Sequence, residues 1–109
     1  MTDRAPTIAT LNDQFRTTFE GGNVFVTIGV QALGHNAVAT ILDRVRLFAR
    51  FDEANDPHGE HDFGVIDGDG PKIFWKIDYY DCALTHHSPD VANPAVTARV
   101  LTIMLAEEY

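Results

Sequence analysis

The sequence is poor in cysteine and in basic residues, and it has no long apolar run. Cys82 is the only cysteine among 109 residues, so one chain can form neither an internal disulfide nor a cysteine-based zinc site. No apolar run approaches the roughly 18 residues that a membrane-spanning helix requires, and residues 1–6 lack the apolar stretch of a secretory signal. We therefore expect a cytoplasmic protein that does not enter a membrane.

The composition is that of an ordinary globular domain. Hydrophobic residues make up 45% of the chain and charged residues 22%, whereas disordered chains contain few hydrophobic residues. A chain of 109 residues fits one domain. We expect residues 1–6 to form a flexible tail and residues 7–109 to form a single domain.

Acidic residues are concentrated in one part of the chain. The net charge is −8, and between Phe51 and Ala98 the only basic residues are Lys72 and Lys76. The ten acidic residues of this segment account for the whole net charge, because acids and bases balance in the remainder. Binding to a phosphate backbone requires clustered lysine and arginine, so we expect no direct binding to nucleic acid. An acidic surface suits a basic partner protein, or it serves only to keep the protein soluble.

Apolar spacing predicts two helices in the first half of the chain. The first has apolar residues three or four apart and begins at Thr7 or Thr10, and Gly21 ends it. Its apolar residues are Ile8, Leu11, Phe15 and Phe19. The second helix covers residues 35–51, where the apolar stripe consists of Val38, Ile41, Leu42, Val45, Phe48 and Ala49.

Alternating apolar residues predict three strands. One strand covers residues 24–30, and a hairpin has arms at 61–67 and 72–81 joined by a glycine-rich turn at 68–71. The second arm should direct one set of side chains toward the core, namely Ile73, Trp75, Ile77 and Tyr79.

The end of the chain has the pattern of a helix. Asn93 and Pro94 are suited to a helix start, and apolar residues follow at Val96, Val100, Ile103 and Met104. We expect a central helix over residues 94–109 and an element order of α-β-α-β-β-α. The predicted fold class is α+β, a three-stranded, mainly antiparallel sheet with helices on one face.

The segment from His58 to Asp62 contains the densest cluster of polar residues. His86 and His87 lie in a second loop beside the same hairpin, and imidazole and carboxylate groups are suitable zinc or iron ligands. The segment lacks the helical spacing of a known zinc motif, and we expect its histidines to make ordinary loop hydrogen bonds.

The sequence contains two further groups of catalytic candidates. Asp78 and Asp81 flank two tyrosines and could act as acid and base if one pKa were raised. Cys82 is a possible nucleophile, but no adjacent positive charge in the sequence would lower the pKa of its thiol. We expect no catalytic residue, no metal site and no cofactor.

Three segments resemble a family of short bacterial proteins of unknown function. They are GEHDFG at residues 59–64, FWKIDYYD at 74–81 and VLTIMLAEEY at 100–109, together with NDQFR at 12–16. Members occur mainly in alphaproteobacteria, often on plasmids and other mobile elements. The resemblance implies no activity that can be assigned to a residue.

We expect a small acidic, non-enzymatic protein that binds a basic surface of another protein, including a nucleic-acid-binding complex. The mobile-element context implied by the resemblance adds a sharper hypothesis, an inhibitor that imitates nucleic acid and blocks a defence complex such as a CRISPR effector or a restriction enzyme. A homodimer is compatible with the sequence. The expected partner-binding residues are Asp52, Glu53, Asp56, Glu60, Asp62, Asp67, Asp69, Asp78, Tyr80 and Asp81. The alternative is a metal-dependent or acid-base hydrolase that uses Glu60, His61, Asp62 and Asp78.

Overall fold

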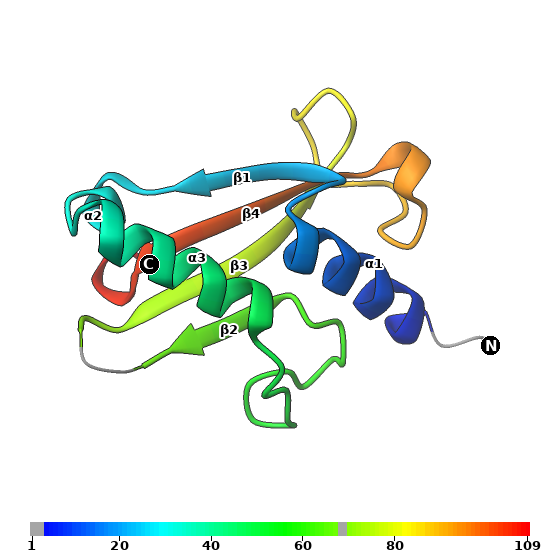
Figure 1. The fold of residues 1–109 in the computed structure, drawn as a ribbon. Helices are drawn as coiled ribbons and strands as arrows, with labels where there is room; N and C mark the ends of the chain where they lie inside the picture. The colour runs from blue at the N-terminus through cyan, green and yellow to red at the C-terminus, as the bar shows by residue number, and fades with distance from the viewer. Residues whose placement is uncertain (1–3, 68–69) are drawn as a thin grey trace.

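A mixed four-stranded sheet with helices packed on one of its faces forms the protein (Figure 1). The computed structural model describes residues 4–67 and 70–109. The helices are α1 (Ala5–Thr18), α2 (Ile28–Gln31) and α3 (His35–Leu47). The strands are β1 (Gly22–Val26), β2 (Phe63–Ile66), β3 (Ile73–Tyr80) and β4 (Ala98–Leu105), and the 3₁₀ turns η1 (Pro94–Val96) and η2 (Ala106–Glu108) flank β4. Within the described ranges, no helix is long and apolar enough to cross a membrane.

The strand order is β1-β4-β3-β2, so the last strand in sequence lies inside the sheet. β1 runs parallel to β4 with Val24 opposite Leu101, whereas β3 is antiparallel to both β4 and β2. The α+β class is confirmed. The prediction of a three-stranded sheet is wrong, because the sheet has a fourth strand, and the sheet is mixed, because β1 and β4 are parallel.

The predicted helix at residues 94–109 is the main error, since most of it forms β4. Arg99, Leu101 and Ile103 are buried on one face of this strand, and Met104 is buried on the other. The outward position Val100 is half-buried and apolar as well, so β4 presents a nearly continuous apolar run, which resembles a buried helix in sequence. The Asn93 side chain does accept a hydrogen bond from the N–H of Ala95, but the helix that it caps is the single turn η1.

The predicted strand at residues 24–30 is too long. β1 ends at Val26, and Thr27 then caps the short helix α2 by accepting a hydrogen bond from the N–H of Val30. A threonine in this role satisfies one of the free N–H groups at a helix start. The alternation of apolar residues continues past Val26, although the backbone changes direction there.

Two helix boundaries also differ from the prediction. α1 begins at Ala5, with Pro6 in its first turn, because proline lacks the N–H that would be unpaired there. The predicted tail at residues 1–6 is therefore too long, and residues 1–3 lie outside the described residues. α3 ends at Leu47, since Phe48 adopts an extended conformation and its ring packs edge-on against Trp75.

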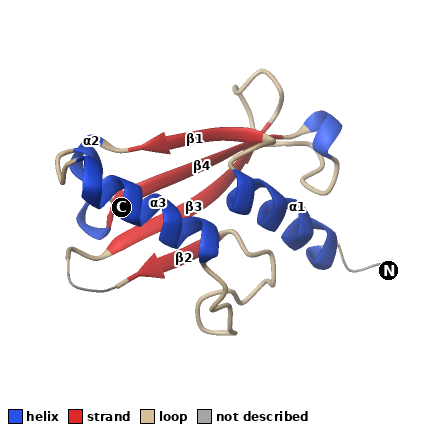
Figure 2. Ribbon diagram, in the orientation of Figure 1, coloured by secondary structure: helices blue, strands red, loops and turns tan. Residues whose placement is uncertain are grey.

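The core lies between the sheet and the helices α1 and α3, which cross the same face (Figure 2). Trp75 is its largest fully buried side chain. The predicted core face of β3 is confirmed, because Ile73, Trp75, Ile77 and Tyr79 are all buried. The predicted hairpin is also confirmed in β2 and β3, while Gly68 and Asp69 of its predicted turn lie outside the described residues.

Candidate functional site

A buried polar cluster joins α1 to the sheet and to the 52–62 loop. We call it the polar junction, and it consists of Asn12, Asp13, Arg16, Glu60, His61, Tyr79 and Arg99. The Asn12 and Arg16 side chains lie one helical turn apart on the face of α1 that meets the sheet, and these residues are 0% and 2% exposed. Buried polar groups at such positions require hydrogen-bond partners.

Asn12 is at the centre of the polar junction. Its Nδ2 donates to the backbone carbonyl of Glu60 at 2.9 Å and to Tyr79 Oη at 2.8 Å. Its Oδ1 accepts from Arg99 Nε at 2.8 Å, and Tyr79 Oη in turn donates to Glu60 Oε1 at 3.2 Å. Burial raises the pKa of Tyr79, so its phenol remains a proton donor at neutral pH. Asn12 therefore connects a helix, a loop and two strands.

Arg99 is a buried cation within β4. Its guanidinium donates from Nη2 to the carbonyl of Val91 at 2.7 Å and lies over the Tyr79 ring at 5.4 Å from the centroid. Burial lowers the pKa of Arg99 because less solvent stabilises its charge. These contacts fix the position of the 82–97 loop relative to the sheet.

His61 lies between two carboxylates. Its Nδ1 is 3.0 Å from Asp13 Oδ2, and its Nε2 is 3.6 Å from Asp56 Oδ2. The imidazole also stacks on the Phe51 ring, with centroids 3.9 Å apart and planes 4° from parallel. His61 has a φ of 56°, a left-handed conformation that is uncommon for residues other than glycine. The backbone here is held by Asp56, whose carboxylate accepts hydrogen bonds from the N–H groups of Glu60 and His61.

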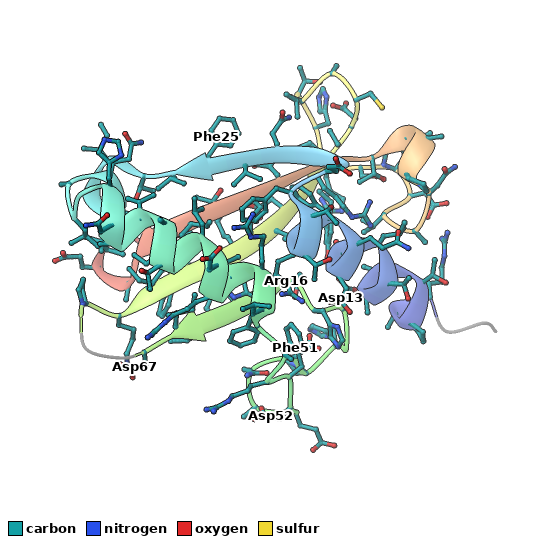
Figure 3. The ribbon with its side chains drawn as sticks, viewed as in Figure 1. Asp13, Arg16, Phe25, Phe51, Asp52 and Asp67 are labelled. Carbon is teal, nitrogen blue, oxygen red and sulfur yellow. The ribbon has the colours of Figure 1, made fainter. Side chains whose placement is uncertain are left out.

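Arg16 completes the polar junction on the side of α3. It donates from Nη1 to the carbonyl of Val45 at 2.8 Å, and its Nη2 lies 3.0 Å from Asp13 Oδ1. Figure 3 shows Asp13, Arg16 and Phe51 close together where α1 meets the loop. The guanidinium lies 5.1 Å from the Trp75 ring centroid and 5.5 Å from that of Phe51.

A pocket of about 400 Å³ opens beside the polar junction, and Asp13, Arg46, Phe51 and His61 are among its lining residues. Its charged groups already have partners in the protein. Asp13 binds Arg16 and His61, and Arg46 forms an ion pair with Asp43. A general base needs a nitrogen or oxygen free to take a proton from substrate, and both nitrogens of His61 face carboxylates. The geometry therefore favours a structural role for the junction.

The structure separates the residues of the predicted hydrolase site. Glu60 contacts Tyr79 on the helix-covered side of the sheet. Asp78 directly precedes Tyr79 in β3, so its side chain points to the opposite face, where it pairs with Lys76 at 3.1 Å. Asp62 has a raised pKa, mainly because of burial and secondarily because of the nearby Glu60 charge. Asp78 therefore does not join Glu60, His61 and Asp62 in one reaction centre.

The histidine loops are also not combined into a metal site. His86 lies 3.6 Å from Asp81, and His87 lies edge-on to the Tyr79 ring at 6.5 Å. Among residues 4–67 and 70–109, no group of three or more histidine, cysteine or carboxylate side chains could hold a metal ion. Cys82 is an exposed thiol that approaches the carbonyl of Ala95 at 3.4 Å.

The predicted partner-binding residues fall into two groups. In the first, the side chains are used within the protein. Asp56 is buried, Asp78 pairs with Lys76, and Asp81 accepts hydrogen bonds from the N–H groups of Thr85 and His86, which lower its pKa. Glu60 belongs to the polar junction. Tyr80 belongs to neither group, because its side chain is exposed on the uncovered face of the sheet.

The second group lies along one side of the molecule. Asp52 and Glu53 are exposed in the loop after α3, Asp62 directly precedes β2 and Asp67 directly follows it. The Asp52 carboxylate also accepts hydrogen bonds from the N–H groups of Ala54 and Asn55. We call these four residues the acidic margin, and Figure 3 shows Asp52 and Asp67 on the same lower side of the view. Within the described part of the chain, none of the four forms an ion pair with lysine or arginine. Asp69 lies outside the described residues.

Sequence reasoning did not identify the residues at the centre of the polar junction. Asn12 lies four residues after Ile8 and Arg16 lies three residues before Phe19, so the helix carries polar residues inside its apolar stripe. Arg99 similarly interrupts an apolar run. The sequence does contain a signal for such a cluster, namely a polar residue at a position that the periodicity assigns to the core. Such a residue is buried only with a hydrogen-bond partner.

Comparison with known proteins identifies the family but no activity. No curated protein and no solved structure matches the chain. One family model, described as a protein of unknown function (DUF3768), matches residues 26–108. The match includes the GEHDFG, FWKIDYYD and most of the VLTIMLAEEY segments, and it begins after the Asn12–Arg16 segment of α1. The chain belongs to the DUF3768 family.

Proposed function

We propose that this chain is a non-enzymatic protein that binds a basic surface of another protein through the acidic margin. The observation that supports it is the contrast between the two sets of charged residues. The charged groups of the polar junction have partners within the protein, whereas Glu53 and Asp67 are exposed and have no cation beside them in the described structure. Exposed charges without partners remain available to an external one.

The physical effect of such a surface is on recognition. Complementary charge accelerates the encounter of two proteins and disfavours partners of the same charge. A net charge of −8 adds to this attraction at long range. In its sharper form, the proposal is that the acidic margin imitates the phosphate backbone and occupies the nucleic-acid site of a defence complex.

The test uses paired charge variants and affinity capture. Glu53→Gln combined with Asp67→Asn removes two charges of the acidic margin, and neither carboxylate makes a hydrogen bond in the described structure. Glu20→Gln combined with Glu107→Gln removes the same charge from exposed positions elsewhere. Each protein is used to capture binding proteins from a lysate of the source organism, and the captured protein is then purified for kinetic measurements.

We expect the margin variant to associate several-fold more slowly with the captured protein, and the difference should shrink as salt rises. Exposed charges are screened over about 8 Å at physiological ionic strength, which explains the salt dependence. Equal effects of the two double variants would contradict docking through the margin. The hypothesis that the acidic margin imitates nucleic acid has a second test. It requires that the captured protein lose nucleic-acid binding when this chain is added.

A further inference from the structure

The strand β2 exposes an unpaired backbone edge. It is the last strand of the sheet order and pairs only with β3. The N–H of Ile77 donates to the carbonyl of Asp62, which places Asp62, Gly64 and Ile66 in the hydrogen-bonded positions that face β3. The N–H and carbonyl groups of Phe63 and Val65 therefore point away from the sheet. An edge with free donors and acceptors is a template for another strand.

A pocket adjoins the same edge on the helix-covered face. It has a volume of about 450 Å³ and lies between α3, the end of β2 and the start of β3. Ala37 and Ile41 of α3 form one wall, and Ile66, Pro71 and Ile73 form the other. Figure 2 shows α3 crossing the sheet beside β2. A strand added at β2 would direct alternate side chains to this face, since side chains alternate along a strand.

The charges around the edge restrict what can bind. Asp62 and Asp67 stand at the two ends of β2, so basic residues at the ends of an added strand would meet opposite charge. Arg44 also lines the pocket and has no ion-pair partner within residues 4–67 and 70–109. A cation inside the pocket would be repelled by Arg44, and the apolar walls favour an aliphatic side chain.

The other edge of the sheet differs in its surroundings. On β1, the carbonyl of Val26 accepts a hydrogen bond from Gln31 Nε2 at 2.6 Å, so part of that edge is covered by α2. The β2 edge has no such side-chain contact at Phe63 or Val65 in the described structure. Among the described strands, β2 alone has an aspartate directly before it and another directly after it.

We propose that β2 receives an extended segment of the partner protein, which pairs with Phe63 and Val65, inserts one aliphatic side chain into the pocket and places basic residues against Asp62 and Asp67. Backbone pairing would supply affinity, and the pocket would supply specificity, as in other cases of strand addition. This inference rests on the proposed function, because it specifies the part of the basic partner that the acidic margin meets.

The probe is the capped peptide KVTLTVK, and its counterpart EVTLTVE carries the opposite charge at both ends. Binding is followed by NMR through the amide shifts and the hydrogen exchange of the full chain. We expect KVTLTVK to shift the amide signals of Phe63 and Val65 and to slow their exchange. EVTLTVE should bind about tenfold more weakly or not at all, because Asp62 and Asp67 repel it.

Two variants with matched controls test the edge and the pocket separately. Val65→Pro removes an N–H that β3 does not use, and edge strands tolerate proline; Val65→Thr keeps the N–H. Ala37→Leu fills the pocket, whereas Ala39→Leu adds the same atoms at an exposed position of α3 outside it. We expect the proline and Ala37 variants to weaken binding about tenfold and the two controls to bind as the parent does.

Several outcomes would overturn the inference. These are shifts that avoid β2, equal binding by Ala37→Leu and Ala39→Leu, or protection of the Phe63 amide by a second copy of the chain without peptide. If the captured partner depends on Glu53 and Asp67 but binds Val65→Pro normally, charge docking stands and strand addition fails. If the peptide pairs with β2 but the charge variants capture the same partner equally, the proposed function fails instead.

Discussion

Arg99 Nε donates a hydrogen bond to Asn12 Oδ1 at 2.8 Å, and this contact joins the last strand of the chain to its first helix. Both residues are almost completely buried. Burying a guanidinium costs free energy unless its donors are paired. The hydrogen bond between Arg99 and Asn12 therefore offsets the cost of burying both side chains. The contact also determines where α1 lies, because Asn12 simultaneously binds Glu60 and Tyr79.

Replacing Asn12 tests this role directly. Asn12→Ala should lower the free energy of unfolding by about 2–4 kcal/mol, because Arg99 Nε and Tyr79 Oη lose a buried partner. Gln14→Ala, on the exposed side of the same helix, should change it by less than about 0.5 kcal/mol. Urea denaturation at neutral pH measures both. Similar values for the two variants would show that the junction does not hold α1 on the sheet.

A second prediction concerns Gly64 in β2, which lies against the face of the core tryptophan. A Cβ at residue 64 would lie 2.6 Å from Trp75 Cε2, closer than real Cβ contacts. Trp75 is fully buried and cannot move freely, so Gly64→Ala should cost about 1–3 kcal/mol through overpacking.

Gly70 provides the matched control for this substitution. A Cβ added at Gly70 meets no atom within 4 Å, so Gly70→Ala should be close to neutral in the same urea titration. Should Gly64→Ala unfold at the parental urea concentration, the close packing of β2 on Trp75 would be disproved.

Sequence patterns were informative where one face of an element is buried. The alternation in β3 correctly placed Trp75 and Ile77 in the core, and the stripe of α3 correctly placed Ile41 and Val45. The same patterns failed for β4, because its outward positions Val100 and Met104 are apolar, as are its core positions Leu101 and Ile103. Apolar residues on both faces hide the alternation from which a strand is recognised.

The candidate surface was harder to predict than the fold. Counting charges along the chain assigned Asp56 and Asp81 to an exposed acidic face, but their carboxylates accept backbone hydrogen bonds of nearby turns. Aspartate is common in turns for this reason, so a local excess of aspartate does not by itself define a surface. The polar junction depends on contacts between residues as distant as Asn12 and Arg99, which no local pattern contains.

The half-buried carboxylate of Asp62 gives a third prediction. Burial raises its pKa in the folded protein above the ordinary 3.8, so the folded state disfavours the ionised form. The resulting loss of folding free energy is absent at a pH below the ordinary pKa and is complete at a pH above the raised pKa. Asp62→Asn should therefore be at least as stable as the parent at neutral pH, and its advantage should disappear as the pH falls through this window.

The measurement is urea unfolding of both proteins at a series of pH values. Asp67→Asn, at the exposed opposite end of β2, controls for the general effect of removing one negative charge from an acidic protein. If Asp62→Asn is less stable than the parent at neutral pH, the carboxylate makes a favourable contact that outweighs the cost of its burial.

The last prediction concerns Glu108, which ties the end of the chain to α2. Its Oε1 accepts hydrogen bonds from Thr27 Oγ1 at 2.6 Å and from the N–H of Leu105 at 2.8 Å, and its Oε2 lies 3.3 Å from the N–H of Gly29. These hydrogen bonds, that of Thr27 first, lower the pKa of Glu108 below its ordinary 4.5. Because the pKa is lowered, the ionised carboxylate stabilises the folded state at a pH above the ordinary pKa, and this contribution is lost as the pH falls through the lowered pKa.

Glu108→Gln should therefore speed hydrogen exchange at the Gly29 and Leu105 amides at neutral pH, because an uncharged amide is a weaker acceptor for both. Glu107→Gln removes the same charge from the neighbouring exposed residue and should leave both amides unchanged. At a pH below the lowered pKa the parent and Glu108→Gln should become alike, and a difference that persists there would show that the ionised carboxylate is not what holds α2 to the end of β4.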